Sequence, residues 1–109
     1  MHSWTVDEVR TYLPRARDLV ELVRASLVPG PDGTFILPAG KEHAEAALDE
    51  LRVRGVILRQ IDAGLVDFPS VEPDGTVRLL CWKVDEPDLE WWHRPEDGFA
   101  GRRRLDQGT

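Results

Sequence analysis

Cysteine is almost absent from this chain, because Cys81 is the single one among 109 residues. One cysteine excludes an intrachain disulfide framework and a four-cysteine zinc site. Long apolar runs are also missing, since no stretch approaches the ~18 uninterrupted apolar residues of a membrane span. The first ten residues carry carboxylates where a signal peptide would have an apolar core. We therefore expect a cytoplasmic protein in a reducing compartment, with no membrane partner.

Basic charge and phosphate-binding glycine motifs are scarce as well. The formal net charge is -6, and residues 62–109 hold six basic and eleven acidic side chains. Nucleic acids are bound mostly through phosphate neutralisation by a basic face. The basic cluster of Arg102, Arg103 and Arg104 is more typical of a solvated tail than of a phosphate site. Neither GxGxxG nor GxxxxGK[ST] occurs, so we expect no nucleic acid partner and no nucleotide cofactor.

What the chain does contain is typical of one globular domain. Hydrophobic residues make up 41% and charged residues 31%, and ~100 to 150 residues is the usual length of a single domain. We expect one domain over residues 1–109. It is divided into a helical pair at 1–54 with a Pro/Gly-rich turn at 28–40, a β-meander at 56–94 and a tail at 95–109.

The N-terminal half predicts two helices. Thr5 and Glu8 have the spacing of a capping box, and Trp4 and Val9 that of a hydrophobic staple. Apolar residues then recur every three or four positions to Leu27, although Pro14 should kink or break this helix. The second helix, at 41–54, ends before Gly55 and should run antiparallel to the first. In the turn between them, Phe35, Ile36 and Leu37 are expected to dock on the core.

The C-terminal half predicts strands, because the apolar period changes from about 3.6 to 2. Turn-forming residues separate four segments, at residues 56–61, 65–71, 76–84 and 89–94. The expected fold class is α+β in two layers, with an antiparallel helical pair packed on a four-stranded antiparallel β-meander.

The turns also predict which residues pair across strands. Arg59 should lie opposite Asp67, Asp67 opposite Cys81, and Lys83 opposite Glu90, which brings opposite charges together in two of the pairs. This register places Asp67 and His93 on opposite faces of the sheet. It also places Trp82 and Trp91 in the core and Trp92 on the reverse face.

Several blocks of sequence resemble a known bacterial family. These blocks are TVDEVRTYLPRAR in the first helix, GLVDFP at 64–69, CW at 81–82, WWH at 91–93 and GFAGRRRL at 98–105. Their order and spacing are similar to those of domain of unknown function 2203, over almost the whole chain. That family has no assigned activity, cofactor or catalytic residues, so the resemblance implies a fold and no chemistry.

Two main hypotheses of function follow from the residues, since the acidic balance disfavours a third, RNA binding through the arginine tail and exposed aromatic residues. The first is a non-catalytic protein–protein interaction or self-assembly module, a homodimer or a binder of another protein. Its surface lies on the apolar reverse face, where tryptophan favours contacts. The candidate contact residues are Leu65, Leu79, Trp92, Phe99, Arg102, Arg103 and Arg104.

The alternative is a small enzyme or a metal-dependent ligand binder. Its candidate residues are Asp67, Cys81, Glu90 and His93, which include the residue types of acid–base dyads and metal sites. The predicted register separates Asp67 from His93, and a carboxylate opposite Cys81 disfavours a thiolate. We therefore favour a salt bridge between Asp67 and Arg59 and a half-buried structural role for Cys81. The sequence therefore predicts no catalytic residue, no metal ligand and no cofactor.

Overall fold

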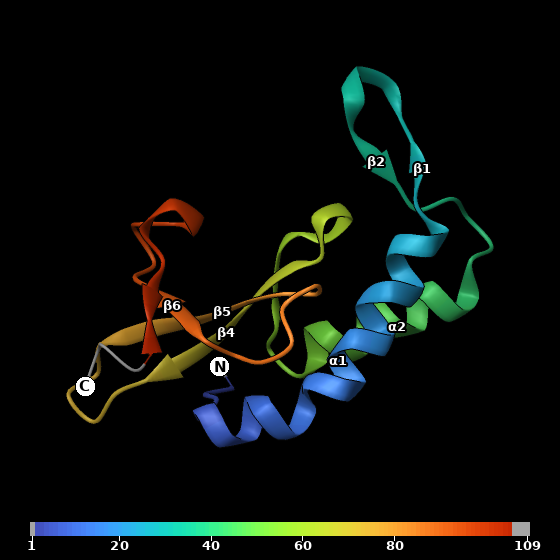
Figure 1. The fold of residues 1–109 in the computed structure, drawn as a ribbon. Coiled ribbons are helices and arrows are strands. Elements are labelled where there is room, and N and C mark those ends of the chain that lie inside the picture. Colours follow the sequence, from blue (N-terminus) through green and yellow to red (C-terminus); the bar gives the residue numbers. More distant parts are fainter. Residues whose placement is uncertain (1, 106–109) are drawn as a thin grey trace.

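The computed structural model describes residues 2–105. Residues 1 and 106–109, the latter part of the expected tail, lie outside the described residues. Two helices and two antiparallel sheets make an α+β fold (Figure 1). In chain order the elements are α1 (Val6–Ser26), β1 (Val28–Pro29), β2 (Phe35–Ile36), α2 (Glu42–Val53), β3 (Ile57–Gln60), β4 (Leu65–Val71), β5 (Val77–Lys83), β6 (Trp91–His93) and β7 (Arg103–Arg104).

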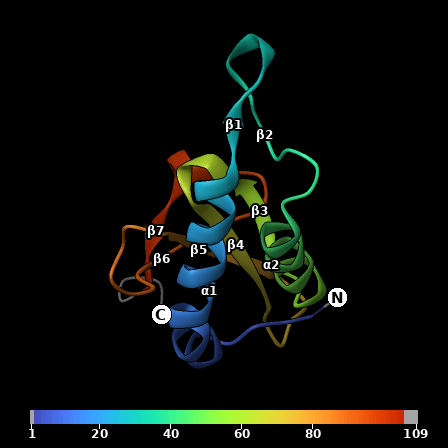
Figure 2. The same cartoon turned by 90° about the vertical axis from the view of Figure 1, so that its right-hand side faces the viewer.

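Both predicted helices are present. The capping box at the start of α1 is confirmed, because the Glu8 N–H donates to the Thr5 hydroxyl and the Thr5 N–H donates to the Glu8 carboxylate. Pro14 lies inside α1, which continues through it as one helix. The ribbon changes direction in its first third rather than breaking (Figure 1). α2 lies beside α1 and runs antiparallel to it (Figure 2).

The larger sheet is a meander, but it has five strands in the order β3-β4-β5-β6-β7. The prediction of four strands is wrong because β7, within the expected tail, pairs with β6. A two-residue strand is too short to show an alternating pattern in the sequence. The second sheet is a hairpin of β1 and β2 inside the segment expected only to turn.

The core lies between the helical pair and one face of the five-stranded sheet. Alternate residues of β4, β5 and β6 supply that face, and they pack against the apolar stripes of α1 and α2. The sheet residues of this core are Val66, Phe68, Leu80, Trp82 and Trp92. The expectation that Trp92 lies on the reverse face is therefore wrong, because Trp92 faces the helices and the partly exposed Trp91 faces away.

This exchange of the two tryptophans follows from the strand register. Asp67 pairs with Cys81 as predicted. On the next strand Leu79 pairs with His93 and Cys81 with Trp91, so Lys83 is not opposite Glu90 as predicted. Because side chains alternate between faces, a shift of one residue moves the whole of β6 to the other face.

The connection between β5 and β6 explains why the turn residues did not reveal this register. It spans residues 84–90 and is organised by Glu86, whose carboxylate accepts the Lys83 N–H and whose carbonyl accepts the Trp82 indole N–H. A tight two-residue turn restricts register strongly, whereas an irregular connection of this length does not.

At the other side of the sheet, Asp67 pairs with Ile57, and the β3–β4 ladder is irregular between Leu58 and Gln60. Arg59 is therefore not opposite Asp67, although its side chain reaches that carboxylate.

Within residues 2–105, no helix has both the length and the apolar composition needed to cross a membrane.

Candidate functional site

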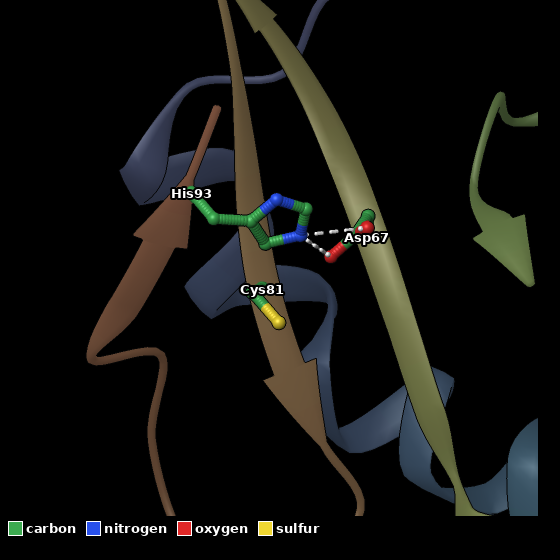
Figure 3. Close-up of side chains that lie close together, drawn as sticks. All are labelled: Asp67, Cys81 and His93. Atoms are coloured by element: carbon green, nitrogen blue, oxygen red, sulfur yellow. Dashed lines mark hydrogen bonds and ion pairs between the residues drawn. The ribbon is translucent and has the colours of Figure 1, made fainter. Parts of the chain in front are cut away.

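Three chemically reactive side chains come together on the face of the sheet that is turned away from the helices. Asp67 on β4 pairs with Cys81 on β5, and His93 lies on β6, the next strand. Each of the three offers a ligand atom within 4.8 Å of the others (Figure 3). All three are buried, with at most 1% of each residue exposed. The expectation that Asp67 and His93 lie on opposite faces is wrong, because of the one-residue shift of β6.

The two ring nitrogens of His93 have different partners. Nδ1 lies 2.8 Å from the carbonyl oxygen of Arg94, and Nε2 lies 3.0 and 3.1 Å from the two carboxylate oxygens of Asp67. A carbonyl oxygen can only accept, so Nδ1 carries a hydrogen and donates it. Nε2 is then the ring nitrogen that faces the carboxylate of Asp67.

Arg59 contacts the same carboxylate. Its Nε donates to Asp67 Oδ2, so the predicted salt bridge between these residues is confirmed. The Asp67 carboxylate therefore lies between the guanidinium of Arg59 and the imidazole of His93.

Cys81 is electrostatically unsuited to act as a nucleophile. Burial, followed by the negative charge of Asp67, raises the pKa of the thiol to about 12, although Arg102 acts in the opposite direction. A nucleophilic cysteine needs a lowered pKa or an adjacent base, and both nitrogens of His93 are engaged elsewhere. The geometry therefore does not support a Cys–His catalytic pair.

Glu90, the fourth residue of the alternative site, is not part of this cluster. Its carboxylate lies 3.8 Å from the guanidinium of Arg104. The predicted grouping of four residues is thus reduced to three in the described part of the chain.

The arginine triplet is held against the body rather than forming a solvated tail. Arg102 donates to both carboxylate oxygens of Glu86, at 2.7 and 2.8 Å, and to the Cys81 carbonyl oxygen at 3.2 Å. Its guanidinium also stacks over the rings of Trp91 and Phe99. In the sequence, the acidic turn at 85–88 was the signal that could have indicated Glu86 as the partner of Arg102.

The surface predicted for protein contacts is mostly inside the molecule. Leu65, Leu79 and Trp92 are buried, so they offer no apolar area to a partner in this structure. Phe99 is 48% exposed, and Arg103 is also exposed. These two residues alone do not make a continuous apolar patch.

Exposed apolar side chains gather instead on the hairpin of β1 and β2. Phe35 is 50% exposed, and Val28 and Ile36 are also exposed, so the expectation that this segment docks on the core is wrong. The hairpin projects beyond the end of α1, away from the sheet (Figures 1 and 2). The sequence shows an apolar run within a proline- and glycine-rich stretch, but it does not indicate that this segment projects away from the core.

A surface cleft of about 420 Å³ lies beside the N-terminal part of α1. The polar groups near it connect the two helices. The Tyr12 hydroxyl donates to the Glu50 carboxylate, which also accepts two hydrogen bonds from Arg15. The bonds from Arg15, then that from Tyr12, lower the pKa of Glu50 to about 2. Burial and Glu50 raise the pKa of Tyr12. These ionisation states link α1 to α2 and leave neither group suited to acid–base catalysis near neutral pH.

The sequence of the chain also matches a known protein family. The model of an uncharacterized conserved protein family, DUF2203, matches residues 37–105. The chain belongs to the DUF2203 family. The match confirms the family seen in the sequence, although the quoted block in α1 lies outside it. It covers α2, the five-stranded sheet and the Asp67–Cys81–His93 cluster. It begins after the projecting hairpin. No curated protein and no solved structure matches the chain.

Proposed function

We propose that this DUF2203 protein is a non-catalytic interaction module that self-associates through its projecting hairpin. The hairpin, residues 28–36, is called the arm below. The observation that carries the proposal is the exposure of Val28, Phe35 and Ile36 on a two-stranded ribbon that projects from the body. An isolated two-stranded hairpin is only marginally stable in water, so a contact that covers these side chains would stabilise it.

The apolar surface of the arm can supply enough free energy for a weak contact. Full burial of a valine, isoleucine or phenylalanine side chain contributes ~1.5–3 kcal/mol. About half of Phe35 and of Ile36, and more than a third of Val28, remain exposed. Covering the rest contributes about 1 kcal/mol per side chain. In a two-fold dimer both arms contribute equally, which doubles the gain.

The backbone of the arm favours a second arm as the occupant. Gly30 N–H donates to the Thr34 carbonyl, and Pro29 pairs with Phe35 in the next position. Hydrogen-bonded and non-hydrogen-bonded pairs alternate in an antiparallel ladder, so the Phe35 N–H points away from β1. The outer edge of β2 is therefore able to accept another strand, whereas Pro29 removes a donor from β1. If β2 pairs with its copy around a two-fold axis, the unpaired backbone groups on the outer edges of both β2 strands form hydrogen bonds with each other.

The base of the arm has the polar rim that is usual around an apolar contact. A surface cleft of about 330 Å³ lies there, bordered by Leu27 and Phe35 and by the charged residues Glu21, Arg24 and Asp62. Charges of both signs on one patch suit a self-complementary interface.

The matched phenylalanines provide the experiment. Phe35 and Phe99 have nearly equal exposure, 50% and 48%, but they lie on the arm and on the sequence-predicted surface, respectively. Sedimentation equilibrium over a wide concentration range should show a monomer–dimer equilibrium for the unmodified chain. Phe35→Ser should shift this equilibrium to monomer by at least ~10-fold in Kd, which corresponds to ~1.4 kcal/mol. Phe99→Ser should leave it unchanged.

Each other outcome has a defined meaning. A strict monomer at every concentration contradicts self-association. Loss of the dimer in Phe99→Ser with retention in Phe35→Ser would return the contact to the surface predicted from the sequence. Circular dichroism of both variants verifies that the fold is intact.

A further inference from the structure

We infer that Asp67, Cys81 and His93 form a binding site for one divalent transition-metal ion of the zinc class. This site is independent of the arm, since it is built on β4, β5 and β6. The donor set consists of a carboxylate oxygen, a thiol sulfur and an imidazole nitrogen. Zinc uses these three ligand types, whereas magnesium and calcium require oxygen ligands.

The spacing of the three atoms fits a single ion. They lie within 4.8 Å of one another, and zinc binds such ligands at ~2.0–2.3 Å. Two ligands of one tetrahedral ion are therefore separated by roughly 3.5 Å. The three atoms therefore need to approach one another by about 1 Å to share one ion. Figure 3 shows all three side chains on the same side of the sheet.

His93 already has the orientation of a metal ligand. Metal-binding histidines nearly always donate their second ring N–H to a carboxylate, a backbone carbonyl or a water. Nδ1 of His93 makes this bond to the Arg94 carbonyl at 2.8 Å, which leaves Nε2 as the ligand atom facing Asp67. A buried imidazole held in this way needs no reorientation to bind an ion.

The charges of the cluster also suit a divalent cation. Metal binding releases the thiol proton to solvent, so the thiolate of Cys81 and the carboxylate of Asp67 together offset the +2 charge of the ion. Arg59 can remain bound to the Asp67 oxygen that the ion does not use.

Arg59 also provides a route of entry. It lies on β3, at the edge of the sheet, and its side chain is 40% exposed while it contacts the buried carboxylate. Displacement of this partly exposed side chain is the route by which we expect an ion to reach the Asp67 carboxylate. Three protein ligands are present in the described residues, so a water molecule completes a tetrahedral set.

Metal titration of the full chain tests the inference directly. The protein, freed of any affinity tag and treated with a chelator, is titrated with Zn²⁺ by calorimetry and with Co²⁺ by absorption spectroscopy. One ion per chain is expected, with a thiolate-to-cobalt charge-transfer band. Mg²⁺ should not compete, because the site has only one carboxylate to offer a hard cation.

Two conservative variants and two controls separate this site from adventitious binding. Cys81→Ser should abolish the charge-transfer band, and both it and His93→Gln should weaken zinc binding at least ~100-fold, the upper end of losses seen for outer-shell partners. Glu90→Gln and His43→Asn, which change residues outside the cluster, should bind as the unmodified chain does. Thermal melts of each variant report whether it is folded.

Three results would overturn the inference. These are the absence of a bound ion in the folded, unmodified chain, a cobalt spectrum without the thiolate band, and undiminished zinc affinity in folded Cys81→Ser and His93→Gln. If both variants unfold, the spectrum of the unmodified chain alone decides, since Cys81 is its single thiol.

Discussion

The arm and the Asp67–Cys81–His93 cluster depart from the usual distribution of residues in opposite ways. The arm places apolar side chains in solvent, whereas the cluster places a carboxylate, an imidazole and a thiol where water does not reach. Val28, Phe35 and Ile36 of the arm keep 38–50% of their surface exposed, while Asp67, Cys81 and His93 of the cluster each have a hydrogen-bond or ionic partner. The arm therefore suits a partner molecule, and the cluster suits a small ion.

The two regions also differ in how they relate to the family. The DUF2203 match covers the cluster and begins at residue 37, after the arm. The proposed self-association therefore depends on residues outside the family match, whereas the proposed metal site lies within it.

The largest effect is expected from removing the carboxylate of the cluster. Asp67→Ala leaves the buried His93 without the hydrogen-bond partner of its Nε2 and frees Arg59, and leaving a buried polar group unsatisfied costs ~1–3 kcal/mol. Urea unfolding should show this loss. The matched control Asp49→Ala changes an exposed aspartate on α2 and should stay within ~0.5 kcal/mol. A loss below ~1 kcal/mol for Asp67→Ala would show that the buried cluster contributes little to the free energy of unfolding.

A smaller effect is expected from the pH dependence of Cys81. The folded pKa of about 12 lies above the ordinary value of 9.0, so the folded state holds the thiol proton more tightly than the unfolded state does. The resulting stability is fully present below pH 9 and is lost as the pH rises toward 12. The metal-free unmodified chain should lose more unfolding free energy over this range than Cys81→Ser does.

The reaction of the thiol with an aromatic disulfide provides a second measurement of the same property. Near pH 8 the native thiol should react at least ~1,000-fold more slowly than the urea-unfolded chain, because only the thiolate reacts. Equal rates in the two states would contradict the burial of Cys81. Identical alkaline profiles for the unmodified chain and Cys81→Ser would contradict the raised pKa.

Much of the fold could be predicted from the sequence. The capping box, the two helices and the antiparallel meander were visible because they depend on local spacing and periodicity. The limits of β4, for example, coincide with the predicted 65–71. The strand β7 could not be predicted, since two consecutive arginines carry no strand pattern and their pairing with β6 depends on tertiary contacts.

The candidate site was predicted less well, and for one physical reason. Asp67, Cys81 and His93 were each identified, and so was the pairing of Asp67 with Cys81. The position of His93 depended on the register of β6, which the connection at 84–90 did not specify. A shift of one residue exchanged Trp91 with Trp92 and brought His93 onto the face of Asp67.

The most direct test of the account is hydrogen exchange at the backbone amide of Phe35, measured as a function of protein concentration. If β2 pairs with its copy, this outward-pointing amide should be unprotected in dilute solution and should become protected as the concentration rises. Amides in the core strand β5 should show unchanged protection over the same range. An amide of Phe35 that exchanges equally fast at every concentration would contradict the proposal that the arm is the surface of self-association.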